Sequence, residues 1–320
     1  MALGSLSTAL VAAVLVAGGC CGPALTGALT SQLSSLLPKE RLPRAFGLDS
    51  LVYNVAGIGG PALAAVLAAV TSAETATLVL AAAAVAGGMI IAALPIRPAA
   101  TSAQRLHVRD LLGGVTAIAR QPVLAAVTAA TTVGQLGAGG LAVIAALLAE
   151  KQGSPTAVGW LLTSMAIGAL AGSVLWTWRP ARPRRAPAVV MVSLIASGLP
   201  LVALAWSPSI VITAVLFGVS GFFNGPMFGA LLTVRNDHAP DHQKSQVFTL
   251  SAGARLTASA AGSALAGVAA GLPLTVLSLT AAGTAIVAGG VGQLVLQRRQ
   301  CEGRHITRLH LSSVGASRAG

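Results

Sequence analysis

Charged residues are scarce in this sequence: 9% of its 320 residues are Asp, Glu, Lys or Arg. A soluble globular domain carries about 25%. A water-soluble chain this poor in charge would expose large apolar patches and aggregate. Because 55% of the residues are hydrophobic, the composition excludes an ordinary soluble domain and favours a chain whose solvent is a lipid bilayer.

Aromatic residues, at 3%, and cysteines are also few. The net charge of +12 could suggest a nucleic-acid partner, but such a domain presents its basic residues along a stripe with aromatics between them. Here Lys and Arg form short clusters between apolar runs, so no nucleic acid is predicted to bind. Cys20, Cys21 and Cys301 have neither disulfide nor metal spacing. No catalytic residue, cofactor or metal site is predicted, and the chain is not expected to be an enzyme.

Long apolar runs fill most of the chain. A bilayer core about 30 Å thick needs about 20 apolar residues per helical span, and backbone groups in lipid must be paired within a helix. The alternating pattern of a membrane β-barrel does not occur. We therefore predict an all-α integral membrane protein with about nine transmembrane helices, at residues 8–36, 46–70, 74–96, 122–149, 156–178, 187–206, 208–234, 246–270 and 273–297.

The basic residues are distributed unevenly between the breaks that separate these runs. Lys151 is the single Lys or Arg in an even-numbered break and Arg255 the single one inside a span, so the other 18 of 20 lie in odd-numbered breaks or in the tail. Cytoplasmic loops concentrate Lys and Arg. This distribution predicts a multi-pass protein of the inner (plasma) membrane with a cytoplasmic C-terminus.

The longest break divides the chain into parts. Residues 97–121 place charged residues among apolar ones at a spacing that suits an amphipathic helix on a membrane surface. We predict a partial N-terminal bundle of three spans at 1–96, a cytoplasmic linker with this helix at 97–121, a complete six-helix bundle at 122–297 and a basic cytoplasmic tail at 298–320.

An internal repeat relates the two bundles. Residues 38–68 align without gaps to residues 240–270, with Phe46 opposite Phe248 and Gly60 opposite Gly262. The offset corresponds to six spans, and both copies follow a basic or polar loop on the same side. Two parallel six-helix halves related by an axis along the membrane normal describe a known transporter architecture, of which the first half here has its last three spans.

The segment Ala56–Ala65 adds a motif. Its Gly60 and Pro61 resemble the Gly-x3-Gly-Pro-x2-Gly-Gly antiporter motif of exporters, with alanine at three of the glycine positions. The chain thereby resembles the major facilitator superfamily, in particular its bacterial drug and metabolite efflux branch, without the first three of twelve helices. The resemblance implies a bundle equivalent to helices 4–12 of that fold. Gly60 and Pro61 could serve as a gate or as a packing contact.

The resemblance also suggests which side chains face a solute. Family helices four, seven and ten line the central cavity and correspond to the first, fourth and seventh spans here, so Thr131, Thr132, Gln135 and Asn224 are substrate-cavity candidates. Arg255 is a further substrate-cavity candidate. An ionisable group inside a span is energetically costly, and such a residue therefore indicates a function. It could bind an anionic group, pair with an acid of missing spans, or reach toward lipid headgroups.

A mostly apolar pocket with a few amides and hydroxyls suits an amphipathic molecule. We therefore predict a transporter that exports a small amphipathic solute by alternating access, with the lipid bilayer and that solute as partners and proton coupling left open. Two alternatives remain at this point. The chain could be a truncated or wrongly started fragment without activity, or it could be a membrane scaffold subunit.

Overall fold

The computed structural model describes residues 22, 27, 29–34, 36–93, 108–154 and 157–317, with the backbone alone in some helical stretches such as 57–62, 108–112 and 299–317. Throughout these ranges the secondary structure is helical, without strands. The α-helices are α2 (Leu42–Val70), α3 (Ala73–Ala93), α4 (Val108–Arg120), α5 (Pro122–Gly139), α6 (Leu141–Lys151), α7 (Val158–Trp178), α8 (Ala186–Ala203), α9 (Ile210–His238), α10 (Lys244–Val268) and α11 (Leu274–Ser317).

Within the described part of the chain, six helical segments are long and apolar enough to cross a membrane. They are Glu74–Ala93, Pro122–Lys151, Val158–Trp178, Pro183–Trp206, Ile210–His238 and Leu274–Arg298. Each coincides with a predicted span, and the predicted all-α membrane fold is confirmed.

The other three predicted spans are not among these six segments, each for a different reason. The run at 8–36 lies mostly outside the described residues, and α2 covers 46–70 with several side chains not described. Helix α10 covers 246–270 and has 25 residues, enough to cross a bilayer core. It is less apolar than its neighbours because it carries Lys, Arg, Gln, Ser and Thr along its length.

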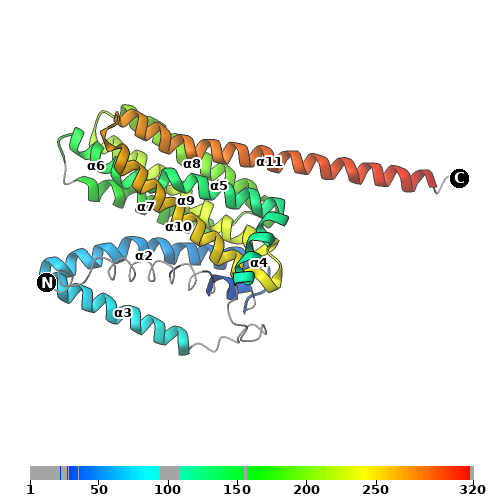
Figure 1. Cartoon of the computed structure of the whole chain (residues 1–320), viewed down its shortest axis with the longest axis horizontal. Coiled ribbons are helices and arrows are strands. Elements are labelled where there is room, and N and C mark those ends of the chain that lie inside the picture. Colours follow the sequence, from blue (N-terminus) through cyan, green and yellow to red (C-terminus); the bar gives the residue numbers. More distant parts are fainter. Residues whose placement is uncertain are drawn as a thin grey trace.

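The helices are arranged as a bundle with a two-helix arm beside it (Figure 1). Helices α5 to α11 form the bundle, α2 packs against α7 and α9, and α3 lies against α2 on the side away from the bundle. Helix α11 continues beyond the bundle to Ser317, into the segment predicted as a tail. Helix α4, within the predicted linker, packs on α5 and α10. The division into domains stays a prediction.

The fourth predicted span is a broken helix rather than a continuous one. Helices α5 and α6 meet at Gly140, and Ser263 of α10 donates a hydrogen bond of 2.6 Å from its hydroxyl to the carbonyl oxygen of Gly139. A Cβ atom on Gly139 would overlap the backbone carbonyl of Ser259. The missing side chain of Gly139 therefore allows α10 to approach closely. At the break, the serine supplies a hydrogen bond to a buried backbone carbonyl, as membrane helices require.

Glycines also bring α7 and α9 together. Added Cβ atoms at Gly168 and Gly172 of α7 would overlap backbone carbonyl oxygens of α9, and one at Gly221 of α9 would overlap the carbonyl of Met165. Small residues permit such backbone contact between membrane helices, where van der Waals packing replaces the hydrophobic effect as the driving force. The two helices are consequently packed backbone to backbone.

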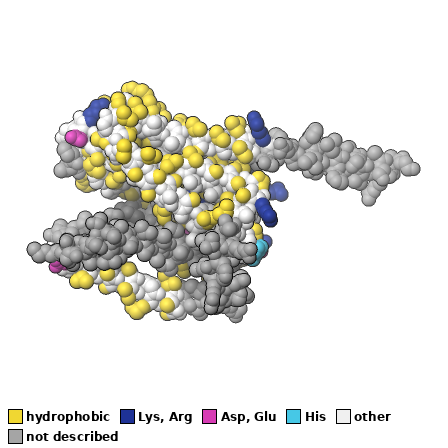
Figure 2. All heavy atoms as spheres, viewed as in Figure 1, with side chains coloured by type: hydrophobic (Ala, Val, Ile, Leu, Met, Phe, Trp, Pro, Cys, Tyr) yellow, Lys and Arg dark blue, Asp and Glu magenta, His cyan; other side chains and the backbone are white. Residues whose placement is uncertain are grey.

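The outer surface suits lipid. Hydrophobic side chains cover much of the face shown in Figure 2, whereas Lys and Arg gather mainly at one end. Trp160 and Trp178 of α7 are each 75% exposed and lie about 27 Å apart at 1.5 Å per residue. That separation approximates the thickness of the hydrocarbon core, and tryptophan is enriched at both of its boundaries. This is a multi-pass membrane protein.

Candidate functional site

The two ends of the bundle differ in charge. The basic end carries Lys39, Arg120, Arg182 and Lys244, all at loops or helix termini. The far end carries the opposite turns, at Thr71, Lys151, Ser207 and Gly271.

A cavity of about 600 Å³ lies between α2 and the bundle. Helices α2, α5, α7, α9 and α10 all contribute side chains to its wall, together with Gly27 and Thr30. Apolar groups form most of the wall, including Met165, Phe228 and Leu256. Its volume falls in the range of small-molecule sites, which are mostly apolar with a few placed polar groups.

Three of the five predicted cavity residues line this space: Gln135, Asn224 and Arg255. Thr131 and Thr132 are not part of the lining. The Thr131 hydroxyl donates instead to the carbonyl oxygen of Val127, at 2.8 Å, one turn back in its own helix. That these side chains contact a solute stays a prediction.

The antiporter-like residues Gly60 and Pro61 lie in α2, whose backbone remains helical through both. Their side-chain surroundings lie outside the described residues. Their role therefore stays a prediction as well.

Arg235 is a cavity residue that the sequence analysis missed. Hydropathy ends the seventh span at Val234 and assigns Arg235 to a loop, but α9 continues to His238. Arg235 thus lies inside the helix, lines the cavity and is only 2% exposed. The signal that could have found it is Pro240, because a proline and not the loss of hydropathy stops this helix.

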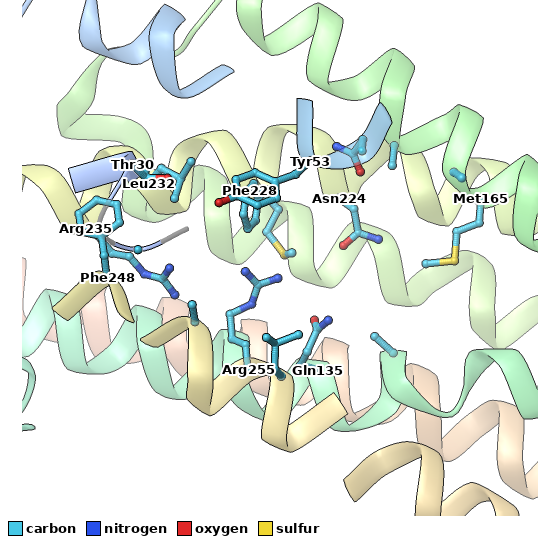
Figure 3. A pocket seen from close by; sticks show the side chains of 18 of the residues that line it. Thr30, Tyr53, Gln135, Met165, Asn224, Phe228, Leu232, Arg235, Phe248 and Arg255 are labelled. Carbon is cyan, nitrogen blue, oxygen red and sulfur yellow. The ribbon is translucent and has the colours of Figure 1, made fainter. Parts of the chain in front are cut away.

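Arg255 of α10 points into the same space (Figure 3). Its guanidinium carbon lies 5.1 Å from the ring centroid of Phe228 on α9, within the range of a cation–π interaction. Tyr53 of α2 also packs against Phe228, with ring centroids 5.5 Å apart in a T-shaped arrangement. The cavity wall therefore joins three helices through Phe228.

Near the basic end, the cavity is closed by four side chains that we call the closing cluster: Leu42, Phe46, Leu232 and Phe248. Each is at most 4% exposed. The Phe46 and Phe248 rings, which occupy equivalent positions in the repeat, lie 6.5 Å apart between centroids. The two copies of the repeat thus meet at the end of the cavity that they close.

Hydrogen bonds between α2 and α7 support this closure. The hydroxyl oxygens of Ser50 and Ser173 lie 3.1 Å apart, and the Asn54 amide nitrogen donates to the Ser173 hydroxyl at 2.9 Å. These contacts use the first half of α2. In Figure 1 the ribbons of α2 and α10 are close at the basic end and diverge toward the far end. Helix α2 is therefore held against the bundle at the basic end.

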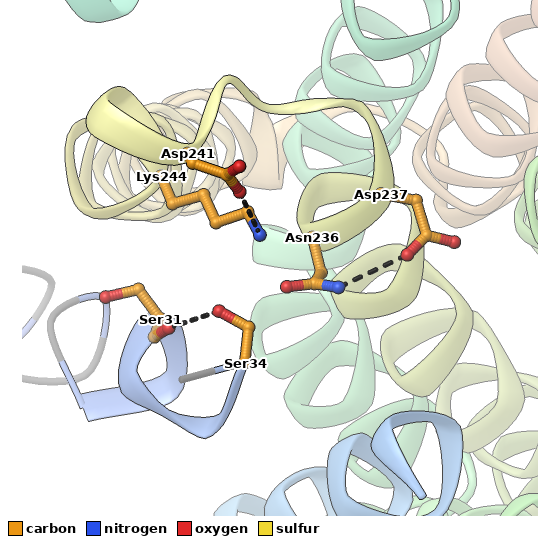
Figure 4. A network of polar contacts seen from close by, with 6 residues as sticks. All are labelled: Ser31, Ser34, Asn236, Asp237, Asp241 and Lys244. Carbon is orange, nitrogen blue, oxygen red and sulfur yellow. Dashed lines mark hydrogen bonds and ion pairs between the residues drawn. The ribbon is translucent and has the colours of Figure 1, made fainter. Parts of the chain in front are cut away.

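Polar contacts surround the closed end on the outside (Figure 4). Lys244 pairs with Asp241 at 2.8 Å, and its hydrogen bond, together with its charge and that of nearby Lys39, lowers the pKa of the Asp241 carboxyl. The Asn236 amide donates to Asp237 at 3.2 Å. The loop at 38–41 and the start of α10 are thus close neighbours. In the described residues no group of three His, Cys, Asp or Glu side chains could hold a metal ion.

Comparison with known proteins gives two matches. The family described as the Major Facilitator Superfamily matches residues 127–306. The chain is also similar to an uncharacterized MFS-type transporter, y4rN, of Sinorhizobium fredii. The two are 25% identical over 294 residues, which cover 89% of this chain and 71% of that protein.

Proposed function

Because this chain belongs to the major facilitator superfamily, a family of membrane transporters, we propose that it moves a small amphipathic solute across the membrane by alternating access through the cavity between α2 and the bundle. Such transporters bind their solute near the midplane and rock one bundle against the other. The cavity joins both repeat-related parts of the chain, as that mechanism requires.

The observation that carries the proposal is the asymmetry of the contacts around the cavity. The closing cluster and the hydrogen bonds of Ser50 and Asn54 hold α2 against the bundle at the basic end. Beyond Asn54 no described side chain of α2 lines the cavity, and α2 diverges from α10 toward the far end (Figure 1). This arrangement corresponds to one of the two states of an alternating-access cycle, with access from the far end.

The contacts at the closed end are individually weak enough to break during a transport cycle. A neutral hydrogen bond contributes about 0.5–1.5 kcal/mol net, and an aromatic pair about 0.5–1.5 kcal/mol beyond the area that it buries. The bonds of Ser50 and Asn54 and the Phe46–Phe248 contact therefore form a closure that solute binding can offset. If the basic end is cytoplasmic, as loop charge favours, this state faces outward.

A bulky side chain inside the cavity tests the proposal. Ala166 lines the cavity, whereas Ala171 of the same helix is exposed on the outer surface. Steric overlap of about 1–3 kcal/mol would weaken solute binding roughly 5- to 150-fold. We expect Ala166→Trp to lower flux of a fluorescent amphipathic solute into proteoliposomes by such a factor, and Ala171→Trp to leave it unchanged. Equal flux in both variants would contradict the proposal, and no flux in the wild type would favour a scaffold subunit.

We further propose that transport is efflux, on the strength of the Gly60-Pro61 motif, and that Asp49 couples it to protons. Asp49 is half-buried on α2 and accepts a hydrogen bond of 2.8 Å from the hydroxyl of Thr30, a residue of the cavity wall. Protonation of its carboxylate would change that contact.

This coupling predicts a loss of pH dependence. In proteoliposomes, an imposed pH gradient should accelerate flux by the wild type severalfold and leave Asp49→Asn at its gradient-free rate. Glu150→Gln, at an exposed position of the far end, is the matched control. A gradient response retained in Asp49→Asn would exclude Asp49 as the coupling residue.

A further inference from the structure

Two arginines point toward the same part of the cavity (Figure 3). Arg235 reaches it from α9 and Arg255 from α10, and their positive charges are close enough to repel each other. The Nε and Nη2 atoms of Arg235 and the Nε atom of Arg255 are buried without a hydrogen-bond partner in the part of the chain that the structure describes. The cavity thus presents unused donors on two cations.

The described acidic side chains do not neutralise them. No Asp or Glu is among the described residues that line the cavity. Asp49 is bonded to Thr30, Asp241 pairs with Lys244 outside the cavity, and Asp237 is exposed beside Asn236. The face of Phe228 stabilises Arg255 in part, but Arg235 has no aromatic ring contact of that kind among the described residues.

Snorkelling does not account for Arg235. An arginine that snorkels keeps its charged group in water or among lipid headgroups, whereas Arg235 is 2% exposed despite lying in the last turn of α9. A buried charge without a partner is strongly disfavoured. Its persistence in this position therefore points to a partner that enters the cavity from outside the chain.

We propose that this partner is an amphipathic organic anion, with a carboxylate, sulfonate or phosphate headgroup held between Arg235 and Arg255. The proposal rests on the transport function proposed above and specifies its substrate class. Guanidinium groups bind such headgroups through paired charge-assisted hydrogen bonds. The amides of Gln135 and Asn224 line the same cavity, on the side of Arg255 away from Arg235 (Figure 3). Met227, Phe228 and Leu256 offer an apolar wall for the rest of the molecule.

A headgroup series on one alkyl chain tests the substrate class. The full chain, in nanodiscs of zwitterionic lipid, is titrated with 1-octanesulfonate, 1-octanol and octyltrimethylammonium. Partition into lipid is measured on empty nanodiscs of the same lipid and subtracted. A hydrogen bond between charged groups is worth enough to change affinity roughly 10- to 100-fold. We expect the sulfonate to bind tighter than octanol by about that factor and the ammonium compound to bind weakest.

Arginine variants then assign the preference to the two side chains. Arg255→Gln and Arg235→Gln should each lose most of the preference for the sulfonate and keep the affinity for octanol. Arg120→Gln, exposed at the end of α4, is the control that should change neither. If Arg235→Gln fails to fold, the headgroup series on the wild type and on Arg255→Gln still tests whether the cavity prefers an anion.

The outcomes separate this proposal from the one on which it rests. Equal affinity for all three headgroups, or an unchanged preference in Arg255→Gln, would overturn the anion assignment while leaving transport intact. If instead none of the compounds binds and flux is insensitive to Ala166→Trp, the transport function itself fails.

Discussion

A disulfide between cysteines placed at positions 50 and 173 is expected to reduce transport to the background of empty liposomes. The hydroxyl oxygens of Ser50 and Ser173 lie 3.1 Å apart, on α2 and α7. A disulfide requires Cβ atoms about 3.5–4.5 Å apart, a separation that two hydrogen-bonded serines can approach with little movement. In the proposed cycle the basic end opens when α2 leaves α7, so the covalent bond would hold the carrier in the state described here.

The measurement compares oxidised and reduced forms of one protein. Cys20, Cys21 and Cys301 are first changed to serine, and Ser50→Cys/Ser173→Cys is reconstituted, oxidised and assayed for solute flux. Addition of a reductant should restore the rate, and each single cysteine variant should be insensitive to oxidant. A cross-linked protein that transports at the reduced rate would show that α2 and α7 do not separate during the cycle.

The second large effect concerns the backbone contact between α7 and α9. A single methyl group at Gly172 would overlap the carbonyl oxygen of Phe222 and approach the Pro226 ring. The helices would have to separate, and overpacking of this kind costs about 1–3 kcal/mol. Because the overlap is with backbone, we expect a cost at the upper end of this range. The better helix propensity of alanine offsets about 1 kcal/mol, so Gly172→Ala should lower the free energy of unfolding by about 2 kcal/mol.

Gly283 of α11 provides the matched control, because a Cβ atom there meets no described atom within 4 Å. Thermal unfolding in detergent should show a lower midpoint for Gly172→Ala and an equal or higher midpoint for Gly283→Ala. Equal midpoints for the two variants would mean that α7 and α9 are not packed backbone to backbone.

Much of the fold could be predicted from the length of apolar runs. Helices α3, α7 and α8 begin within two residues of the predicted spans, because lipid leaves a long apolar segment no other structure. The break at Gly140 could not be predicted from the length of apolar runs. It depends on Ser259 and Ser263, more than 100 residues away in the sequence, and hydropathy carries no information about such a neighbour.

The site was predicted less completely, for the same reason. Gln135, Asn224 and Arg255 could be chosen because polar residues inside spans are few, and the structure brings these three to one cavity. Arg235 was assigned to a loop by its position after the last apolar residue. Asn54 and Ser173 looked ordinary, and their hydrogen bond becomes visible only when α2 and α7 are side by side.

The two arginines of the cavity also bear on how the protein responds to voltage. An electric field across a bilayer acts on every charge within its thickness, and one elementary charge that crosses 100 mV gains or loses about 2.3 kcal/mol. Arg235 and Arg255 carry positive charge on α9 and α10, where they line the cavity. In the proposed cycle, a movement that shifts them relative to the field would make the balance between the two access states depend on membrane potential, and a bound solute that adds charge to the cavity would change that dependence.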